Sequence, residues 1–423
     1  MRRLGLYILP STLCAPGLGL GVQCFLPAAR CPLPAAFRRL FFPLSASCQL
    51  FLLHHGRLML IDQPRVPIRD VLLYGLWPGF IKVMIYRLKG YRIGKGVSIG
   101  LGSVICADRV EIGDHASIGF LTILRGKEIR LGAHVQIGST TFLDTPYIDI
   151  GEGSKINEQV FVGGLQFPDS RFVLGRNCQV MQMTFINPAP SVIAGDDTGI
   201  GGHCLIFGHT SWLSQFDGYT VDFAPIEIGN SVSLAWRVFV LPGSKIGDGA
   251  VVGANSVVHG TIPPRCLAIG FPARVISKYP DFPKELSDQE KVDIFRKMVQ
   301  EMARFFVGSG LRCTQDGDRL EVIQSSRGWL KRRDRRWLMH IADGNARDAV
   351  ERLPSRALDV FLGLREIPDD VRRSLESRGV VWIEIARKER SHLSNDLGEE
   401  VLHFLKRYGV RTLRATCPSH REG

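Results

Sequence analysis

The sequence predicts a mainly β protein, in which short strands stack into a long coil that is followed by a small α/β domain. Aliphatic residues recur every six positions from Ile93 onward, and 27 of the 45 glycines fall between Ile93 and Ser277. Beyond about residue 310, strand-like runs alternate with helical patterns, as in α/β domains. A hydrophobic share of 45% and a charged share of 22% over 423 residues exclude a wholly disordered chain.

The six-residue period is clearest in IGNSVS LAWRVF VLPGSK IGDGAV VGANSV, which begins at Ile228. A helix repeats its apolar face every 3.6 residues and a strand every 2, so a period of six fits neither alone. It fits short strands separated by corners, with aliphatic residues inside and Gly, Asn or Asp at the corners. Segments that break the pattern are expected to be loops pushed out of the coil: Pro146–Ile148, Phe167–Arg171 and Trp212–Pro225.

These repeats and the ending IGDGAVVGANSVVHGTIPPRCLAIGFPARVI resemble the hexapeptide-repeat acyltransferases, such as galactoside, maltose and capsular-polysaccharide O-acetyltransferases. The resemblance covers about Ile93 to Lys278, which is under half of the chain. It implies a left-handed parallel β-helix of triangular section, with three hexapeptides per turn, assembled as a homotrimer. It also implies acetyl-CoA or another acyl-CoA as a co-substrate, with no permanently bound cofactor.

His209 is the expected catalytic residue. Acyl transfer to a hydroxyl needs a base that works near pH 7, and histidine is the natural candidate. His209 stands in LIFGHTSW, before the long insertion and the Pro225–Gly229 step, where the resembling enzymes carry their catalytic histidine. The alternative is a surface histidine. His203 is expected to assist on the substrate side at most, whereas His115, His134 and His259 are expected to be solvated.

The resemblance further implies that coenzyme A lies along the last repeats, between neighbouring subunits. Its expected contacts on this chain are Ala235, Trp236, Gly253, Ala254 and Ser256, with Arg265, Arg274 and Lys278 near the phosphates. Asp217 and Tyr219 in the inserted loop either contact a sugar hydroxyl or face solvent. Trp236 is displaced from its usual place in the family's pattern, which leaves open an acyl group other than acetyl.

The function expected from these features is O-acyl transfer from coenzyme A to a hydroxyl of a carbohydrate or nucleotide-sugar, by direct transfer. One alternative is a non-catalytic trimeric assembly module. A second is a zinc lyase of the carbonic-anhydrase type, which would need closely placed histidines such as His203 and His209. No metal site is expected, since the ten cysteines include no C-x-x-C pair.

Charge bears on the partners and the location of the protein. The net charge of +12 comes mostly from the two ends of the chain, with six Arg and no Asp or Glu in residues 1–61, so we expect no nucleic-acid partner. Residues 71–88 are apolar with several aromatics; they predict either a helix packed on the coil or a peripheral membrane anchor. We expect a cytoplasmic location, with the inner face of the membrane as the alternative.

Five segments are expected: a disordered leader or targeting segment (1–58), a helical segment (59–92), the coil (93–278), a helical linker (279–309) and a small α/β domain (310–416). Ser287 to Glu290 form a capping box, so a helix is expected over 287–306. Strands are expected over 359–364, 380–385 and 410–414, with helices between them. The basic run 329–337 is expected at a solvated hairpin tip rather than on a nucleic-acid surface.

Overall fold

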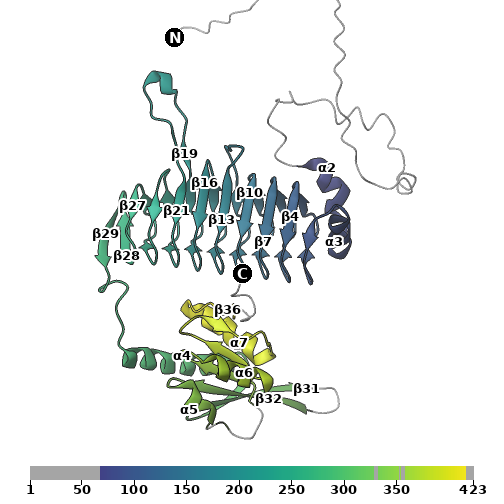
Figure 1. The fold of residues 1–423 in the computed structure, drawn as a ribbon, viewed down its shortest axis with the longest axis vertical. Helices are drawn as coiled ribbons and strands as arrows, with labels where there is room; N and C mark the ends of the chain where they lie inside the picture. Colours follow the sequence, from purple (N-terminus) through teal and green to yellow (C-terminus); the bar gives the residue numbers. More distant parts are fainter. Residues whose placement is uncertain (1–66, 328–331, 352, 354–357, 416–423) are drawn as a thin grey trace, which may run out of the picture. The chain divides into compact units, whose positions relative to one another are not determined.

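The computed structural model describes residues 67–327, 332–351, 353 and 358–415. The leader expected over 1–58 and the tip of the basic hairpin, 328–331, lie outside these residues. The fold class is confirmed: a parallel β-helix, a short helical segment before it and a small α/β domain after it (Figure 1).

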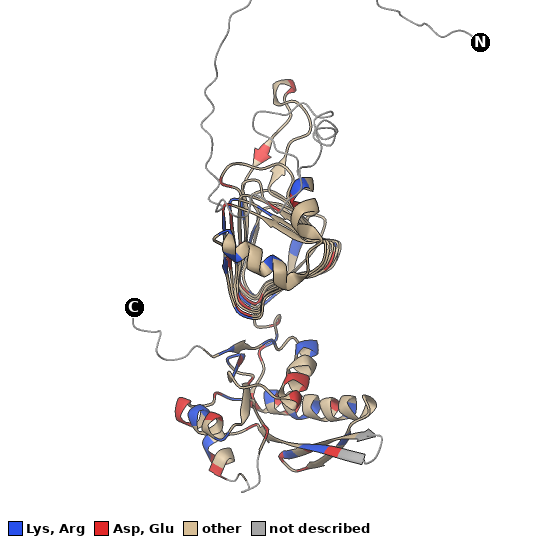
Figure 2. Cartoon of the chain, turned by 90° about the vertical axis from the view of Figure 1, so that its right-hand side faces the viewer, with Lys and Arg blue, Asp and Glu red and all other residues tan. Residues whose placement is uncertain are grey.

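The coil is built from three sheets, one on each side of a three-sided section (Figure 2). The first side consists of β1 (Arg92–Ile93), β4 (Arg109–Ile112), β7 (Glu128–Leu131), β10 (Tyr147–Ile150), β13 (Arg171–Leu174), β16 (Ser191–Ala194), β21 (Ile226–Ile228), β24 (Lys245–Ile246) and β27 (Thr261–Ile262). The second consists of β2 (Ser98–Ile99), β5 (Ser117–Ile118), β8 (Gln136–Ile137), β11 (Lys155–Ile156), β14 (Gln179–Val180), β17 (Gly199–Ile200), β22 (Ser233–Leu234), β25 (Val251–Val252), β28 (Cys266–Gly270) and β29 (Ala273–Lys278). The third consists of β3 (Val104–Cys106), β6 (Ile123–Arg125), β9 (Phe142–Asp144), β12 (Phe161–Val162), β15 (Phe185–Asn187), β18 (Leu205–Phe207), β23 (Phe239–Val240) and β26 (Val257–Val258).

The repeating aliphatic residues fill the inside of the coil. Each strand pairs in parallel with the equivalent strand of the next turn, and only β28 and β29 pair antiparallel at the end. The residues of the predicted frame are almost fully buried in one continuous core: Ile228, Leu234, Val240, Ile246, Val252 and Val258. The period of six therefore located the interior of the coil correctly.

The expected loop at Pro146–Ile148 is wrong. Tyr147 and Ile148 belong to β10, and Tyr147 pairs with Glu128, nineteen residues earlier, as Glu128 pairs with Arg109. Thr145 and Pro146 occupy an ordinary corner, so no segment leaves the coil there. The other two interruptions do leave it, as the loop between β12 and β13 and as the hairpin after β18, although Arg171 already belongs to β13.

A bent pair of short helices closes the first turn of the coil, and we call Ile68–Leu88 the end cap. It comprises α2 (Ile68–Asp70), the π-helical turn η2 (Val71–Gly75) and α3 (Gly79–Leu88). Lys82 is buried and donates hydrogen bonds to the carbonyl oxygens of Gly100 and Ser103, at 2.6 and 3.0 Å. A Cβ atom at Gly79 would lie 2.7 Å from the oxygen of Ile99, so glycine permits this close approach.

The C-terminal domain has one seven-stranded mixed sheet with helices on both faces. Its strands are β30 (Arg312–Asp316), β31 (Arg319–Arg327), β32 (Arg332–Ala342), β33 (Val360–Gly363), β34 (Val381–Glu384), β35 (Glu389–Arg390) and β36 (Leu413–Arg414). Its helices are α4 (Asp288–Gly308), α5 (Ala346–Glu351), α6 (Asp369–Ser377) and α7 (Asp396–Leu405), with the 3₁₀ turn η4 (Lys406–Tyr408). One apolar core joins α4 and α7 to the sheet, and a second joins α5 and α6 to it. The predicted capping box is present in α4.

Candidate functional site

The inserted segment leaves the coil as a hairpin that begins at His209. Strand β18 ends at Phe207, and β19 (His209–Thr210) then pairs antiparallel with β20 (Asp222–Phe223). The chain rejoins the coil at β21, which pairs with β16 of the preceding turn. His209 therefore stands at the root of the hairpin, directly beside the coil, where a side chain is held on both sides.

Two phenylalanines hold the His209 ring. Phe223 lies opposite His209 in the hairpin and stacks on the imidazole, with ring centroids 5.9 Å apart and an interplanar angle of 11°. Phe207, two residues earlier, is tilted against it at 6.0 Å. Phe223 is itself fixed by an edge contact with Phe167, from the loop after β12. The hairpin and two separate turns of the coil thus determine where the imidazole lies.

The electrostatic setting of His209 suits a base. The ring is half-buried, and burial lowers the pKa of His209 below the ordinary value for histidine. Its Nδ1 atom is buried and has no hydrogen-bond partner among the residues that the structure describes. A neutral imidazole has a lone pair on one ring nitrogen, and this lone pair can accept a proton near pH 7.

His203 does not join His209. It lies at the corner before β18, whereas His209 follows β18, so the two histidines stand at opposite ends of that strand. His203 is exposed, and its ring is tilted against Trp236 at 5.9 Å. Within the described part of this chain, no three His, Cys, Asp or Glu side chains are grouped so that they could hold a metal ion.

Four of the residues expected near the donor line one corner of the last turns. Ala235, Trp236, Gly253 and Ala254 follow the neighbouring strands β22 and β25, and His203 lies beside Trp236. Ser256 also lies near this corner, but it is fully buried and its hydroxyl accepts a hydrogen bond from the Gly270 amide at 3.0 Å. Ser256 therefore stabilises the coil and does not face a ligand in this chain.

The expected basic residues are exposed at the end of the coil. Arg265 lies over the ring of Tyr279 at 3.4 Å, while Arg274 and Lys278 lie on β29. In this single chain, the corner with Trp236 and the root of the hairpin are separated by the width of the third side of the coil. The structure does not bring the expected donor residues to His209.

Asp217 and Tyr219 lie in the exposed part of the hairpin. Asp217 ends the short 3₁₀ turn η3 (Gln215–Asp217), and both Asp217 and Tyr219 are exposed. Trp212 and Phe216 in the same loop are almost completely exposed, at 96% and 104%. The loop thus presents aromatic side chains to solvent, an arrangement that usually marks a contact surface.

Sequence reasoning missed the aromatic row that leads to His209. Phe142, Phe161 and Phe185 stack on successive turns, with centroids 5.1 and 4.8 Å apart, and Phe207 continues the row at 5.2 Å. The signal was present in the repeats, because phenylalanine directly precedes the inward residue in TTFL, QVFV and MTFI. These are outward positions, where a soluble coil would ordinarily carry polar residues.

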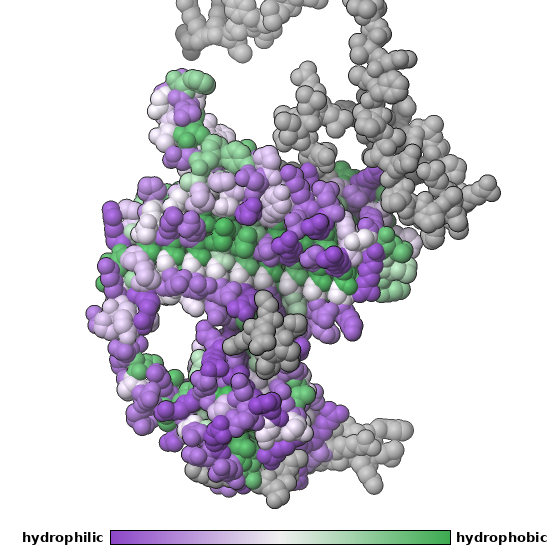
Figure 3. Space-filling view, viewed as in Figure 1, coloured by the Kyte–Doolittle hydropathy of each residue, from purple (hydrophilic) through white to green (hydrophobic). Residues whose placement is uncertain are grey.

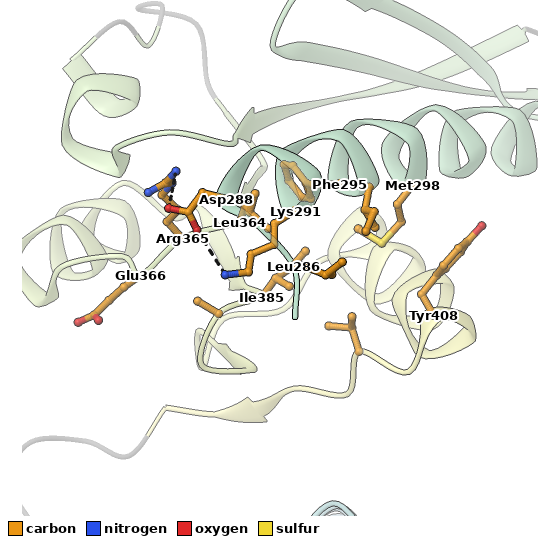
Figure 4. Close-up of a pocket in the computed structure, with 13 residues that line it drawn as sticks. Leu286, Asp288, Lys291, Phe295, Met298, Leu364, Arg365, Glu366, Ile385 and Tyr408 are labelled. Carbon is orange, nitrogen blue, oxygen red and sulfur yellow. Dashed lines mark hydrogen bonds and ion pairs between the residues drawn. The ribbon is translucent and has the colours of Figure 1, made fainter. Parts of the chain in front are cut away.

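A separate hollow of about 610 Å³ lies in the C-terminal domain, beside α4 (Figure 4). Apolar side chains line much of it, among them Phe295, Met298 and Ile385. At one side Asp288 pairs with Lys291 at 3.3 Å and with Arg365 at 3.7 Å. None of the site residues expected from the sequence lies in this hollow, and its charged groups are already paired.

Stacked six-residue repeats in a parallel β-helix, with a histidine at the root of an inserted hairpin, are the arrangement that the resemblance to hexapeptide-repeat acyltransferases predicts. Comparison with curated proteins confirms the resemblance. The chain is 40% identical to the "Putative lipopolysaccharide biosynthesis O-acetyl transferase WbbJ" of Escherichia coli (strain K12), over 24% of this chain and 58% of that protein. It is 33% identical to the "Putative acetyltransferase C18B11.09c" of Schizosaccharomyces pombe, over 26% and 50%. The chain thus spans about half the length of the curated relatives it matches, and no protein-family model matches it.

Solved structures also match parts of the chain. The polySia-specific acetyltransferase NeuO matches with 16% identity and a TM-score of 0.33, over 48% of this chain and 94% of that one. A galactoside acetyltransferase in complex with coenzyme A matches with 25% identity and a TM-score of 0.24, over 34% and 65%.

Proposed function

We propose that this chain is an acyl-CoA-dependent O-acyltransferase, in which His209 is the general base that activates a carbohydrate hydroxyl. The observation that carries the proposal is the His209 ring, half-buried between Phe207 and Phe223 with a lowered pKa and an unpartnered Nδ1. The 40% identity to a protein named for O-acetyl transfer in lipopolysaccharide biosynthesis supports both the chemistry and the class of acceptor.

The reaction follows from a neutral imidazole. His209 accepts the proton of the acceptor hydroxyl. At the same time the hydroxyl oxygen attacks the thioester carbonyl, and a carbon–oxygen bond forms. Hydrogen-bond donors stabilise the tetrahedral oxyanion. As the carbon–sulfur bond breaks, the imidazolium returns the proton to the thiolate, so the products are an ester and free coenzyme A. The acyl group passes directly from donor to acceptor.

We propose that the complete site forms between copies of the chain in a homotrimer. Outward residues on the third side of the coil are apolar from turn to turn: Ile123, Phe142, Phe161, Phe185, Leu205, Phe239 and Val257. The same positions on the first side carry paired charges, such as Arg92 with Glu111 and Lys245 with Glu227. Burying the apolar side against a neighbour would bring that neighbour's Trp236 corner toward His209 and complete a donor site.

The same interface leaves a second function to be tested. An apolar side and an exposed aromatic loop would also suit a non-catalytic trimeric module. Sedimentation should give three times the 47.0 kDa of one chain. A monomer that becomes no larger at high concentration would contradict the proposed trimer and the shared site.

The deciding experiment measures thiol release from acetyl-CoA over a panel of sugars and nucleotide-sugars. We expect turnover with at least one carbohydrate acceptor, and His209→Ala should lower kcat by about 10²–10⁴ with unchanged folding. His259→Ala is the matched control, since His259 is an exposed histidine at the end of the coil. A fully active His209→Ala enzyme would refute the assignment, and failure of the wild type to bind coenzyme A would favour the assembly module.

A further inference from the structure

The end cap buries one face of α3 and leaves the opposite face apolar and exposed. Lys82, Val83 and Tyr86 pack on the coil. On the other side, Phe80, Met84 and Leu88 recur at four-residue spacing and are exposed by 77%, 56% and 77%. Leu72, Leu73, Leu76 and Trp77 extend this surface onto the neighbouring turns. Figure 3 shows hydrophobic residues gathered at this end of the coil.

Basic residues outnumber acidic ones in the end cap and directly after it. Residues 67–95 contain six Lys or Arg and a single acidic residue, Asp70. All of the basic residues except Lys82 are exposed: Arg69, Arg87, Lys89, Arg92 and Lys95. Burial raises the pKa of the Cys106 thiol to about 12, and the nearby Asp70 carboxylate raises it further. The cap thus combines exposed apolar side chains with more basic than acidic residues, and Figure 2 shows Lys and Arg in blue on its helices.

We infer that the end cap docks the protein on an anionic lipid surface. An apolar helical stripe flanked by Lys and Arg, with Trp at its border, is the pattern of interfacial helices. Each basic residue near an anionic leaflet adds about 1 kcal/mol of attraction at moderate ionic strength. A second copy of the cap, or residues 1–61, would fit this face less well than anionic lipid. Both carry positive charge, which the basic residues of the cap would repel.

The packing of the cap indicates surface binding rather than insertion across the bilayer. In the described part of the chain, no single helix is long and apolar enough to cross a membrane; only Ile68–Gly75 with Gly79–Leu88, bent by 116°, meets the length and composition together. Lys82 and Tyr86 tie α3 to the first turns of the coil, the Tyr86 hydroxyl accepting from the Ile105 amide at 3.0 Å. The buried face therefore stays on the coil, while the exposed face meets lipid.

The experiment measures flotation of the full chain with vesicles of phosphatidylcholine containing about one third phosphatidylglycerol. We expect binding that weakens on pure phosphatidylcholine and at about 0.5 M salt. The double variant Leu76→Gln, Phe80→Gln should lower the partition coefficient by about tenfold for each side chain. The matched control Ile276→Gln, Val307→Gln removes two side chains exposed by 57% and 53% away from the cap, and should bind as the wild type does.

Three outcomes would overturn this inference. The first is a wild-type chain that does not bind these vesicles. The second is a double variant that binds as tightly as the wild type, which would assign the binding to another segment. The third is a wild-type chain whose binding is unaffected by lipid charge while the double variant loses self-association, which would make the cap a contact between copies. A thermal midpoint like that of the wild type verifies that each variant is folded.

Discussion

Gly208 provides a test of how tightly the coil positions His209. A Cβ atom built on Gly208 would lie 2.6 Å from the backbone oxygen of Ala189 and 2.9 Å from its carbonyl carbon. Gly208 also donates to the Asn187 oxygen and accepts from the Ala224 amide, each at 3.0 Å. Because backbone atoms surround it on both sides, Gly208→Ala must displace the root of the hairpin.

The size of the effect follows from these distances. An ordinary contact needs about 0.8 Å more room than the 2.6 Å available, so His209 should move by a comparable amount. A misplacement of about 1 Å can cost about 10²-fold in rate, and overpacking of this kind costs about 1–3 kcal/mol of stability. We therefore expect kcat in the thiol-release assay to fall by about 10²-fold, with a lower thermal midpoint and a folded coil.

Gly199→Ala is the matched control for this substitution. Gly199 lies in β17 of the same coil, and a Cβ atom there would meet nothing within 4 Å. Its kcat and thermal midpoint should stay close to those of the wild type. The reasoning is refuted if Gly208→Ala keeps wild-type kcat, or if Gly199→Ala loses as much activity.

Two further predictions concern the pH profile and the C-terminal domain. Since burial lowers the pKa of His209, the neutral base persists below pH 6.5, and activity should fall only on further acidification. Phe223→Ala exposes the ring, so the acid limb of the kcat/KM profile should shift to higher pH. An unshifted acid limb would contradict the stacking argument. In the C-terminal domain, Arg372→Ala should lower the free energy of unfolding in urea by about 3–5 kcal/mol, because it leaves the buried Glu384 carboxylate, 2.5 Å away, without its cation. Arg347→Ala, which breaks an exposed pair, should cost about 0–1 kcal/mol, and equal losses in the two variants would contradict the burial argument.

Repeating local features made the coil predictable from sequence. Inward residues such as Ile246 and Val252 have the same surroundings as the equivalent residues of neighbouring turns, so the same sequence pattern indicates the fold in every turn. The false loop at Pro146 arose because a corner that takes one extra residue looks like an interruption until strand pairing is known. In the C-terminal domain, the capping box that begins at Ser287 predicted the start of α4, because it depends only on residues close in sequence.

The surroundings of the site were less predictable because they depend on contacts between distant residues. The motif located His209, but the stack with Phe223 forms only because the hairpin pairs residues fourteen positions apart. Ser256 looked available in the sequence, yet its hydroxyl is committed to the Gly270 amide. The parallel pairing of β32, β33 and β34 likewise has no local signal, since the order of strands in a sheet is decided by tertiary packing.

Equal steps between turns make the coil a molecular ruler. From β3, beside the end cap, to β18, which carries His209 at its end, the third sheet advances through five strand spacings, or about 24 Å. If the cap rests on lipid, this number of turns fixes the height at which the imidazole meets an acceptor. Removing one whole turn between the cap and His209 would lower that height by about 4.8 Å without altering the chemistry. The number of repeats therefore sets how far from the membrane a tethered glycan must extend to meet His209.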